Sequence, residues 1–334
     1  MNDTDNHRHT ADKRGTYEVW YMTWNHPGTD QGFWLRYITE QPLSGPARGE
    51  LWFARFDPKD PARTFGFHKQ LAIEQVSAST SPFSLSLGAS RLGHDHAVGQ
   101  ADGDGHSISW DLRWMPAAST VRLLPDLAYS LKIGETVALW PNQRVPMTGS
   151  LVVDGERLSF DHVPLGQCHL WGTKHAYNWT WAHCVDFAGA PDAGIELLAV
   201  KLHKRGRTIG PLVMLHLDLD GERHDLHQFR HVARNRAQWG GTRVTFTAQS
   251  LRLKVEGELT CEPRDMILAP YEDPDGTHVY CSNTEIGDAH LTVYKRSGMG
   301  WREHRTLVAK RRAHFELGGR ERDPAVAREH IVVP

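Results

Sequence analysis

The segment from residue 163 to residue 187, VPLGQCHLWGTKHAYNWTWAHCVDF, gathers side chains that could do chemistry. It holds three tryptophans, three histidines and two cysteines within 25 residues. A metal site, a redox pair, an aromatic ligand pocket and a plain barrel core would each produce such a run. The spacing of these residues and the rest of the chain must separate the four possibilities.

The loop at the centre of this segment combines a flat aromatic surface with ionisable groups. Trp171 and the turn-forming Gly172 precede Lys174 and His175. Imidazole titrates near neutral pH, so His175 is a candidate general acid or base, and Lys174 is a second candidate donor. An apolar substrate with one polar end would suit this surface. A loop that closes a barrel with a tryptophan plug would carry the same residues.

Strict alternation follows the loop and predicts a β-strand over 177–187. Trp179, Trp181 and His183 fall on one face of it, whereas Asn178 begins a face of small and polar residues. In a small barrel one face of a strand looks into the lumen and the other looks outward. The aromatic face is therefore either packed core or the lining of a ligand cavity.

Metal, redox and nucleotide chemistry find little support. Cys168 and Cys184 do not have zinc-ligand spacing relative to the nearby histidines, and the pair His227 and His231 lacks the glutamate of a HExxH site. The chain contains no G-x-S-x-G, no G-x-G-x-x-G after a strand and no P-loop. We expect no bound metal and no cofactor.

Composition excludes further classes. The chain of 334 residues carries 38 Lys plus Arg against 40 Asp plus Glu, a formal net charge of −2, which gives no overall electrostatic case for nucleic acid or for an anionic membrane. No stretch approaches 18 consecutive apolar residues, so no transmembrane segment is expected. The polar N-terminus lacks the apolar core of a secretory signal, and the four cysteines are expected to be free thiols of a cytoplasmic protein.

Short alternating runs broken by Gly, Pro, Asp and Asn dominate the chain and predict an all-β protein. Strands are expected at 17–24, 32–38, 50–56, 64–69, 83–87, 106–114, 150–153, 177–187, 195–203, 211–218, 243–248, 251–257, 277–282, 290–295 and 302–309. The best short helix candidate is 225–236. Many strands at roughly 10-residue spacing are typical of barrels or sandwiches, and the length suits two tandem antiparallel barrels.

The predicted division places a disordered tail at 1–15, one barrel at 16–163, a second at 164–318 and an extended tail at 319–334. Some charged residues fall inside the predicted strands. Glu18 and Arg36 either pair inside the first barrel or face solvent. Glu285 closes a predicted strand at a barrel mouth, as a surface residue or as part of a site.

Several short motifs together resemble one protein family. Trp171-Gly172, Trp179-x-Trp181 and Phe187 are similar to a "WG…WxW…F" segment, and residues 18–21, 32–37, 109–112 and 149–155 continue the similarity across the chain. The family is the lipocalin-like, two-barrel (calycin) group of tocopherol cyclase, carotenoid 1,2-hydratase (hydroxyneurosporene synthase) and natural-product pericyclic cyclases. The chain resembles its uncharacterised members most.

This resemblance implies two lipocalin-like barrels with a hydrophobic pocket at or between them. Family substrates are isoprenoids, polyenes or similar greasy molecules, and a protonated alkene would be stabilised by aromatic faces. The implied substrate-binding residues are the aromatic and polar side chains of the motifs: Trp20, Trp34, Arg36, Trp171, Asn178, Trp179, Trp181 and His183. Asp186 is the candidate catalytic acid within the motif, beside His175 and Lys174 from the loop.

The expected function is that of a cofactor-independent cyclase, isomerase or hydratase of a hydrophobic isoprenoid, polyene or polyketide-like small molecule. The alternative is a non-catalytic carrier or sensor of a hydrophobic ligand on the same fold. A structural subunit that only docks a partner is a third class. The three classes differ in what a pocket must contain: an enzyme needs a proton donor beside the aromatic side chains, whereas a carrier needs only an apolar lumen.

Overall fold

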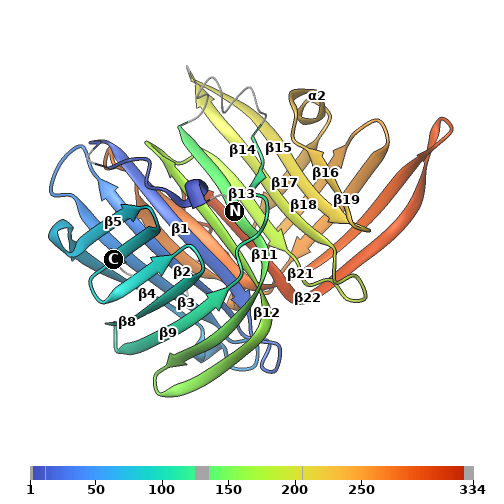
Figure 1. Cartoon of the computed structure of the whole chain (residues 1–334). Helices are drawn as coiled ribbons and strands as arrows, with labels where there is room; N and C mark the ends of the chain where they lie inside the picture. Colours follow the sequence, from blue (N-terminus) through green and yellow to red (C-terminus); the bar gives the residue numbers. More distant parts are fainter. Residues whose placement is uncertain (1–2, 12, 125–134, 205, 327–334) are drawn as a thin grey trace.

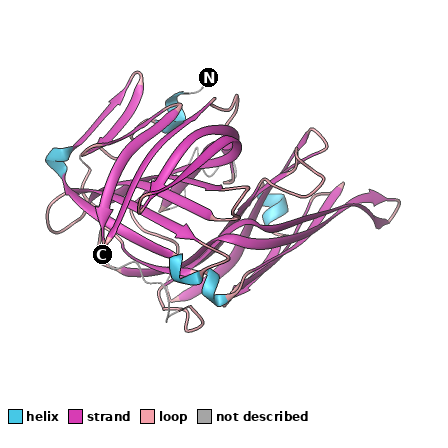
Figure 2. Ribbon diagram, turned by 90° about the horizontal axis from the view of Figure 1, so that it is seen from below, coloured by secondary structure: helices cyan, strands magenta, loops and turns pink. Residues whose placement is uncertain are grey.

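A computed structural model describes residues 3–11, 13–124, 135–204 and 206–326. Within these residues the chain forms two antiparallel sheets, each curled into a barrel, which pack side by side (Figure 1). The second view shows strands almost throughout, with only short helical turns at the rims (Figure 2). The prediction of two tandem lipocalin-like barrels is confirmed.

The first barrel contains the strands β1 (Thr16–Asn25), β2 (Gly32–Gln41), β3 (Arg48–Phe56), β4 (Phe65–Ala72), β5 (Val76–Thr80), β6 (Phe83–Leu87), β7 (Ser90–Gly93), β8 (His96–Gly103), β9 (His106–Trp114), β10 (Val121–Arg122), β11 (Thr136–Val153) and β12 (Glu156–Gly172). Their order is β4-β3-β2-β1-β12-β11-β9-β8-β7-β6-β5, with β10 on β11. The last long strand, β12, therefore lies beside the first, β1.

The second barrel contains β13 (Asn178–Cys184), β14 (Gly194–Lys204), β15 (Arg207–Leu219), β16 (Glu222–Leu226), β17 (Arg236–Gly240), β18 (Arg243–Gln249), β19 (Leu253–Thr260), β20 (Ile267–Glu272), β21 (His278–Ser297) and β22 (Gly300–Gly319). Their order is β16-β15-β14-β13-β22-β21-β19-β18-β17, with β20 on β21. The helical turns are η1 (Asp3–Asn6), η2 (Pro61–Arg63), η3 (Ile73–Gln75), α2 (Phe229–Val232) and η4 (Pro263–Asp265).

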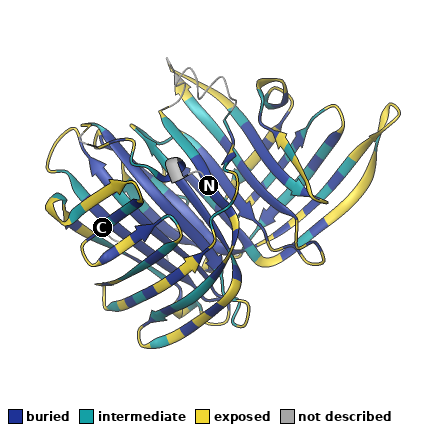
Figure 3. Ribbon diagram, in the orientation of Figure 1, coloured by how far each residue is buried: buried dark blue, intermediate teal, exposed yellow. Residues whose placement is uncertain are grey.

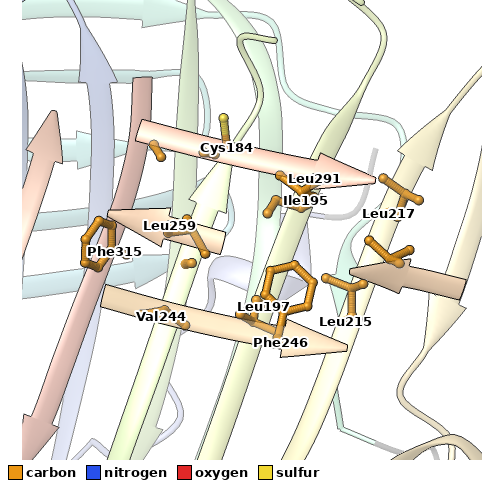
Figure 4. Close-up of a cluster of buried hydrophobic side chains, with 14 of the residues drawn as sticks. Cys184, Ile195, Leu197, Leu215, Leu217, Val244, Phe246, Leu259, Leu291 and Phe315 are labelled. Atoms are coloured by element: carbon orange, nitrogen blue, oxygen red, sulfur yellow. The ribbon is translucent and has the colours of Figure 1, made fainter. Parts of the chain in front are cut away.

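Three apolar clusters account for the packing. The first barrel encloses an aromatic core with Trp20, Trp24 and Phe33. The second encloses an aliphatic core, whose Leu, Ile and Val side chains converge around Phe246 and Phe315 (Figure 4). A third cluster lies between the barrels, and Figure 3 shows the strands that meet there as buried.

Strand β1 serves two of these clusters because its side chains alternate. Trp20, Met22 and Trp24 point into the first barrel, whereas Tyr17 and Tyr21 belong to the cluster between the barrels. The outward face of β1, which a lone barrel would show to water, is thus covered by the second barrel.

The two sheets divide at residues 173–177 rather than at the predicted boundary after 163. Strand β12 continues through that position and pairs with β1 from Leu165 to Gly172. The interruption at Asp161 and His162 is a local kink, because His162 adopts a left-handed φ of 53° while the strand goes on. A kink within a strand and a linker between two domains both contain polar and turn-forming residues, so the sequence alone does not distinguish them.

The residues of the predicted tail at 1–15 pack over the end of the first barrel where the structure describes them. Asn6 is fully buried, and the backbone N–H groups of His9 and Thr10 donate to the Glu18 carboxylate at 2.7 and 2.9 Å. Glu18 also lies 2.8 Å from His169. The buried charge of Glu18 needs these donors, and the N-terminal segment supplies them. The predicted tail at 319–334 lies partly outside the described residues, which end at 326.

The predicted helix at 225–236 is wrong for most of its length: only the short α2 is helical, between β16 and β17. No helix among the described residues is long and apolar enough to cross a membrane.

Candidate active site

A cavity of about 150 Å³ lies between the barrels. Its floor is the outward face of β1 to β4, and its roof comes from β20, the start of β21 and the linker between the barrels. The lining residues are Tyr17, Val19, Arg36, Ile38, Glu40, Arg48, Glu50, Trp52, His68, Gln70, His175, Pro270, Tyr271, Glu272 and His278. We call this the inter-barrel cavity.

Strand register explains why these side chains meet. Tyr17 lies opposite Glu40, and Glu40 lies opposite Arg48, so the three form one row across the sheet. The next row contains Ile38 and Glu50. Residues directly opposite one another share a face, so charged and aromatic side chains from four strands converge on one surface.

Glu50 is held as a carboxylate. Its Oε1 accepts from Arg48 Nε at 2.7 Å, its Oε2 accepts from Trp52 Nε1 at 2.8 Å, and His68 Nε2 lies 3.3 Å from Oε2. Burial by itself would raise the pKa of Glu50, but these donors, His68 first, lower it to about 2. Glu50 is therefore ionised at neutral pH.

Glu40 is in the opposite state. It pairs with Arg48 Nη2 at 2.5 Å through Oε2, whereas Oε1 is buried without a hydrogen-bond partner. Burial, together with the negative charge of Glu50, raises the pKa of Glu40 to about 7. At neutral pH a large fraction of Glu40 therefore carries a proton.

Arg48 joins these two carboxyl groups, which lie in one cavity with pKa values pushed apart. A neutral acid beside an ionised carboxylate is the pattern that assigns proton donor and proton acceptor in many active sites. The arrangement can deliver a proton to a bound molecule and take one back.

Arg36 supplies a fixed positive charge at the inner end of the cavity. It pairs with Glu316 of the second barrel at 3.1 Å and donates to the Tyr271 hydroxyl. Its guanidinium lies 4.5 Å from the Trp34 ring centroid and 4.6 Å from that of Tyr21. Neither alternative predicted for Glu18 and Arg36, pairing with each other or facing solvent, holds: Arg36 bridges the barrels, and the buried Glu18 binds His169.

His175, predicted as a general acid or base, lies on the cavity wall. Its Nδ1 is 2.6 Å from Asp273 Oδ1, and Arg320 Nη1 donates to Asp273 Oδ2 at 2.8 Å. Burial by itself raises the pKa of Asp273, but His175 and then Arg320 outweigh it and lower the pKa. The His175 ring stacks on Tyr17 at 4.7 Å and on Trp179 at 5.3 Å. Asp273 thereby fixes the ring and leaves Nε2 as the nitrogen available to a ligand.

The other residues predicted from the segment 171–183 lie around the interface without lining the cavity. Lys174 forms an ion pair with Asp275 at 2.6 Å at the rim. Trp179 Nε1 donates to Glu316 at 2.9 Å and Trp181 Nε1 to Glu196 at 3.0 Å. The aromatic face of β13 thus looks toward the first barrel and packs in the cluster between the barrels.

Five more of the predicted residues have partners that give them structural roles. His183 Nδ1 lies 2.5 Å from Glu196, and Asn178 donates to the backbone carbonyl of Gly318. Trp171 stacks on His9 at 3.9 Å over the end of the first barrel, and Trp20 is in the core of that barrel. Trp34 belongs to the cluster between the barrels.

The structure does not bring Asp186 together with His175. Asp186 lines a different hollow, of about 200 Å³, where Arg312 Nε donates to it at 3.2 Å. Its side chain is 55% exposed. Asp186 is thus an exposed, ion-paired carboxylate outside the inter-barrel cavity.

A second buried acid lies deeper between the barrels. Glu285, which is fully buried in the middle of β21, accepts from the Tyr21 hydroxyl at 2.8 Å, and its other oxygen contacts the Thr23 hydroxyl. Thr23 Oγ1 lies 2.6 Å from His314 Nδ1, and His314 Nε2 lies 2.7 Å from Asn25 Oδ1. We call Tyr21, Thr23, Asn25, Glu285 and His314 the interface chain.

The donors in the interface chain follow one direction. The Asn25 amide donates to the Glu285 backbone carbonyl at 2.7 Å, so Asn25 Oδ1 must accept from His314 Nε2–H. Burial lowers the pKa of His314 well below its usual value, so Nδ1 has no proton and accepts from Thr23. The proton between Thr23 and Glu285 then comes from Glu285. Burial accordingly raises the pKa of Glu285 to about 8.

Sequence reasoning missed Glu40, Glu50, His68 and Asp273, and it placed Glu285 at a strand end. Glu40 and Glu50 fall on the face of their strands opposite the core of the first barrel, where polar residues normally meet water. The one signal for a covered face was the alternation itself, since Arg36, Trp52 and the two acids occupy the same face of β2 and β3.

Comparisons with known proteins agree with this fold. An uncharacterized protein of Mycobacterium tuberculosis is 26% identical over 283 residues, 84% of this chain and 82% of its own length. Two solved structures are each 11% identical: a Nitrosomonas europaea protein assigned as AttH (TM-score 0.59, 94% of this chain and 95% of that one) and kievitone hydratase of Nectria haematococca (TM-score 0.50, 90% and 88%).

The sequence profile of one family covers more than half of the chain. It matches residues 144–319, which run from the long strands β11 and β12 through the whole second barrel. This range includes the aromatic segment, His175, Asp273 and Glu285, whereas Glu40 and Glu50 lie outside it. The chain belongs to the tocopherol cyclase-like family.

Proposed function

We propose that the protein is a cofactor-independent cyclase, isomerase or hydratase that transfers protons to and from a hydrophobic small molecule bound in the inter-barrel cavity. The observation that carries this proposal is the pair of carboxyl groups on Arg48. Glu40, with an unpartnered oxygen and a pKa of about 7, is the proton donor. Glu50, with a pKa of about 2, is the anionic member of the pair.

The chemistry follows from the lining. Glu40 transfers its proton to one carbon of an alkene, whose electron pair forms the new C–H bond and leaves a carbocation on the other carbon. The faces of Tyr17, Trp52 and Tyr271 stabilise that positive charge. A hydroxyl group of the substrate closes a ring, or water adds, and the proton released returns to the Glu40 carboxylate.

His175 and Arg36 complete the proposed site. The His175 ring is oriented by Asp273 and can accept or donate a proton at the polar end of the substrate. Arg36 is paired with Glu316 but still lines the cavity, where its charge can hold an electronegative oxygen. Asp273 is a positioning residue, since it acts through His175.

The size of the cavity restricts what it encloses. Its volume of about 150 Å³ is below the range of about 300–1,000 Å³ that is typical of pockets for drug-sized ligands. An isoprenoid or polyene substrate would therefore place its reacting end in the cavity and extend the remaining chain through the mouth.

The relatives support a reaction of this kind. The family takes its name from a cyclase, and one protein of similar fold is named as a hydratase. Ring closure by attack on a protonated alkene and hydration of an alkene share their first step. The same acid therefore serves either outcome, and the substrate determines which nucleophile follows.

The experiment is a comparison of ligands that co-purify from the native host. Wild type, Glu40→Gln and the matched control Glu285→Gln are extracted, and the bound compounds are compared by native and liquid-chromatography mass spectrometry. We expect Glu40→Gln to hold a compound, the substrate, that differs from the one held by the other two. If all three proteins held the same compound, the proposal of an enzyme would be contradicted and a carrier indicated.

A further inference from the structure

Charge is distributed unevenly along a chain whose net charge is only −2. Residues 197–217 contain four Lys or Arg and no Asp or Glu, and residues 226–255 contain six Lys or Arg and no Asp or Glu. Two acid-free stretches of this length are unusual for a chain with 40 acidic residues. They belong to β14, β15, α2, β17, β18 and the start of β19.

These two stretches form one wall of the second barrel. The Asn235 side chain, which follows α2, donates to the Val213 carbonyl in β15 at 2.9 Å. Lys201 of β14 places its ammonium 4.6 Å from the Trp239 ring centroid in β17. The end of β14, the start of β15 and the short α2 lie along the upper rim of this barrel in Figure 1.

Basic and apolar side chains are exposed together on this rim. Ile209 is 47% exposed and Phe229 is 54% exposed, and Arg207, Arg230 and Arg234, which lie within five residues of one or the other in the sequence, are exposed as well. Among the residues that the structure describes, these three arginines form no ion pair with a carboxylate. We call Arg207, Ile209, Phe229, Arg230 and Arg234 the basic face.

We propose that the basic face docks on the surface of an anionic lipid bilayer. Arginines next to partly exposed aliphatic and aromatic side chains suit a surface with phosphate groups above hydrocarbon. The arginines would bind the headgroups, while Phe229 and Ile209 enter the boundary with the acyl chains. The two stretches add no carboxylate of their own, and the nearby Asp225 is paired with His216 at 2.6 Å, so little like-charge repulsion opposes contact with such a surface.

The basic face lies at the same end of the second barrel as the inter-barrel cavity. The Tyr177 ring, itself 42% exposed, lies 5.0 Å from that of His203 in β14. Tyr177 is two residues from His175, which lines the cavity. A docked protein would therefore present the mouth of its cavity near the bilayer, where a hydrophobic substrate dissolves. This use of the face rests on the proposed function, whereas the docking itself does not.

A nucleic acid also offers phosphates, but it explains less of the surface. Phosphate contacts require cations and polar donors, and they give no reason for Ile209 and Phe229 to be exposed beside them. A bilayer accounts for both components.

The test is co-sedimentation of the full chain with vesicles of phosphatidylcholine alone or with about one third phosphatidylglycerol. We expect binding only to the anionic vesicles, and release on raising the salt from 0.05 to 0.5 M, roughly a threefold shorter Debye length. The variant Arg207→Glu/Arg230→Glu/Arg234→Glu is expected to lose on the order of a hundredfold in partitioning. Ile209→Ser/Phe229→Ser is expected to lose about tenfold.

Matched controls lie on the exposed hairpin of β21 and β22 and on the turn between β18 and β19. Lys295→Glu/Arg296→Glu/Arg302→Glu makes the same change of charge, and Leu251→Ser with Met299→Ser replaces two apolar residues that are 75% and 95% exposed. Both controls should bind like wild type. Equal losses in controls and variants, equal binding to both kinds of vesicle, or binding to duplex DNA in place of vesicles would each overturn the proposal. Because no turnover is measured, these results are independent of the role of Glu40.

Discussion

Two acids with raised pKa values lie between the barrels, and their surroundings differ. Glu40 lines a cavity, shares Arg48 with an ionised neighbour, and has one oxygen without a partner. Glu285 is sealed away, and both of its oxygens and its backbone carbonyl have partners in the first barrel. A raised pKa therefore has a different consequence at each site. The proton on Glu40 can be transferred to a bound molecule, whereas the proton on Glu285 completes a set of hydrogen bonds.

The difference teaches that accessibility has to be considered together with the pKa. Burial is the largest cause of the shift at both sites. What separates them is that Glu40 lines the inter-barrel cavity and has one oxygen without a partner, whereas both carboxyl oxygens of Glu285 have partners. Replacing each acid with glutamine, its uncharged isostere, tests whether the two acids have different roles.

The largest effect is expected for turnover in Glu40→Gln. Loss of a general acid typically costs about 10²- to 10⁴-fold in rate, and we expect a loss in this range when turnover of the compound from Glu40→Gln is assayed. Because the acid form is active, the wild-type rate should fall as pH rises through about 7, the pKa of Glu40. Turnover in Glu285→Gln should stay near that of wild type. A comparable loss there would remove the distinction between the two acids.

Stability should respond in the opposite way. Glu285→Ala leaves the Tyr21 hydroxyl without its acceptor and the Thr23 hydroxyl without the donor from Glu285, and we expect the free energy of unfolding to fall by about 3 kcal/mol. Glu285→Gln preserves a donor toward Thr23 and an acceptor for Tyr21, so it should cost little near pH 5. Chemical denaturation followed by circular dichroism measures both variants.

The pH dependence of that experiment has a definite sign. The folded pKa of Glu285, about 8, lies above the unfolded value of about 4.3. Between these values the folded state keeps a proton that the unfolded state has released. Wild-type stability should therefore fall between pH 5 and pH 8, by on the order of 3 kcal/mol, relative to Glu285→Gln. Parallel pH curves for the two proteins would show that Glu285 is ionised in the folded state.

The smallest effect is expected for Asp186→Asn. Asp186 is exposed and paired with Arg312, so its loss should change the unfolding free energy by less than about 1 kcal/mol and leave turnover unchanged. A strong loss of turnover in Asp186→Asn with an unchanged fold would indicate that Asp186, and not Glu40, is the catalytic acid.

Much of the fold could be predicted because its causes are local. The strands β6 and β9 have the expected bounds, 83–87 and 106–114, since alternation and flanking turns are sequence properties. The long strands β11 and β21 were predicted only in part, as 150–153 and as 277–282 with 290–295, and β12 was not predicted, because bulges and kinks place polar residues inside these continuous strands. The interrupted pattern at 161–166 suggested a domain boundary, but these residues lie inside the continuous strand β12, where His162 adopts a left-handed φ.

Residues of the candidate site could be predicted only where they belong to a recognisable local motif of the sequence. His175 follows a tryptophan-glycine turn and lies on the cavity wall as expected, although its role stays a prediction. Glu40 and Glu50 could not be found in this way, because nothing near them in the sequence says that a second barrel covers their face. His175 also depends on Asp273, which is 98 residues away.

Strand β1 carries a consequence for how the protein can vary. Its inward side chains fill the first barrel, and its outward side chains Tyr21, Thr23 and Asn25 hold Glu285 and His314. A shift of β1 by one residue would exchange the two sets and disrupt both contacts at once. Insertions and deletions in β1 should therefore not be tolerated, even where the surrounding loops change length. If the first barrel is joined to a different second barrel, that barrel must supply residues equivalent to Glu285 and His314 for β1 to contact.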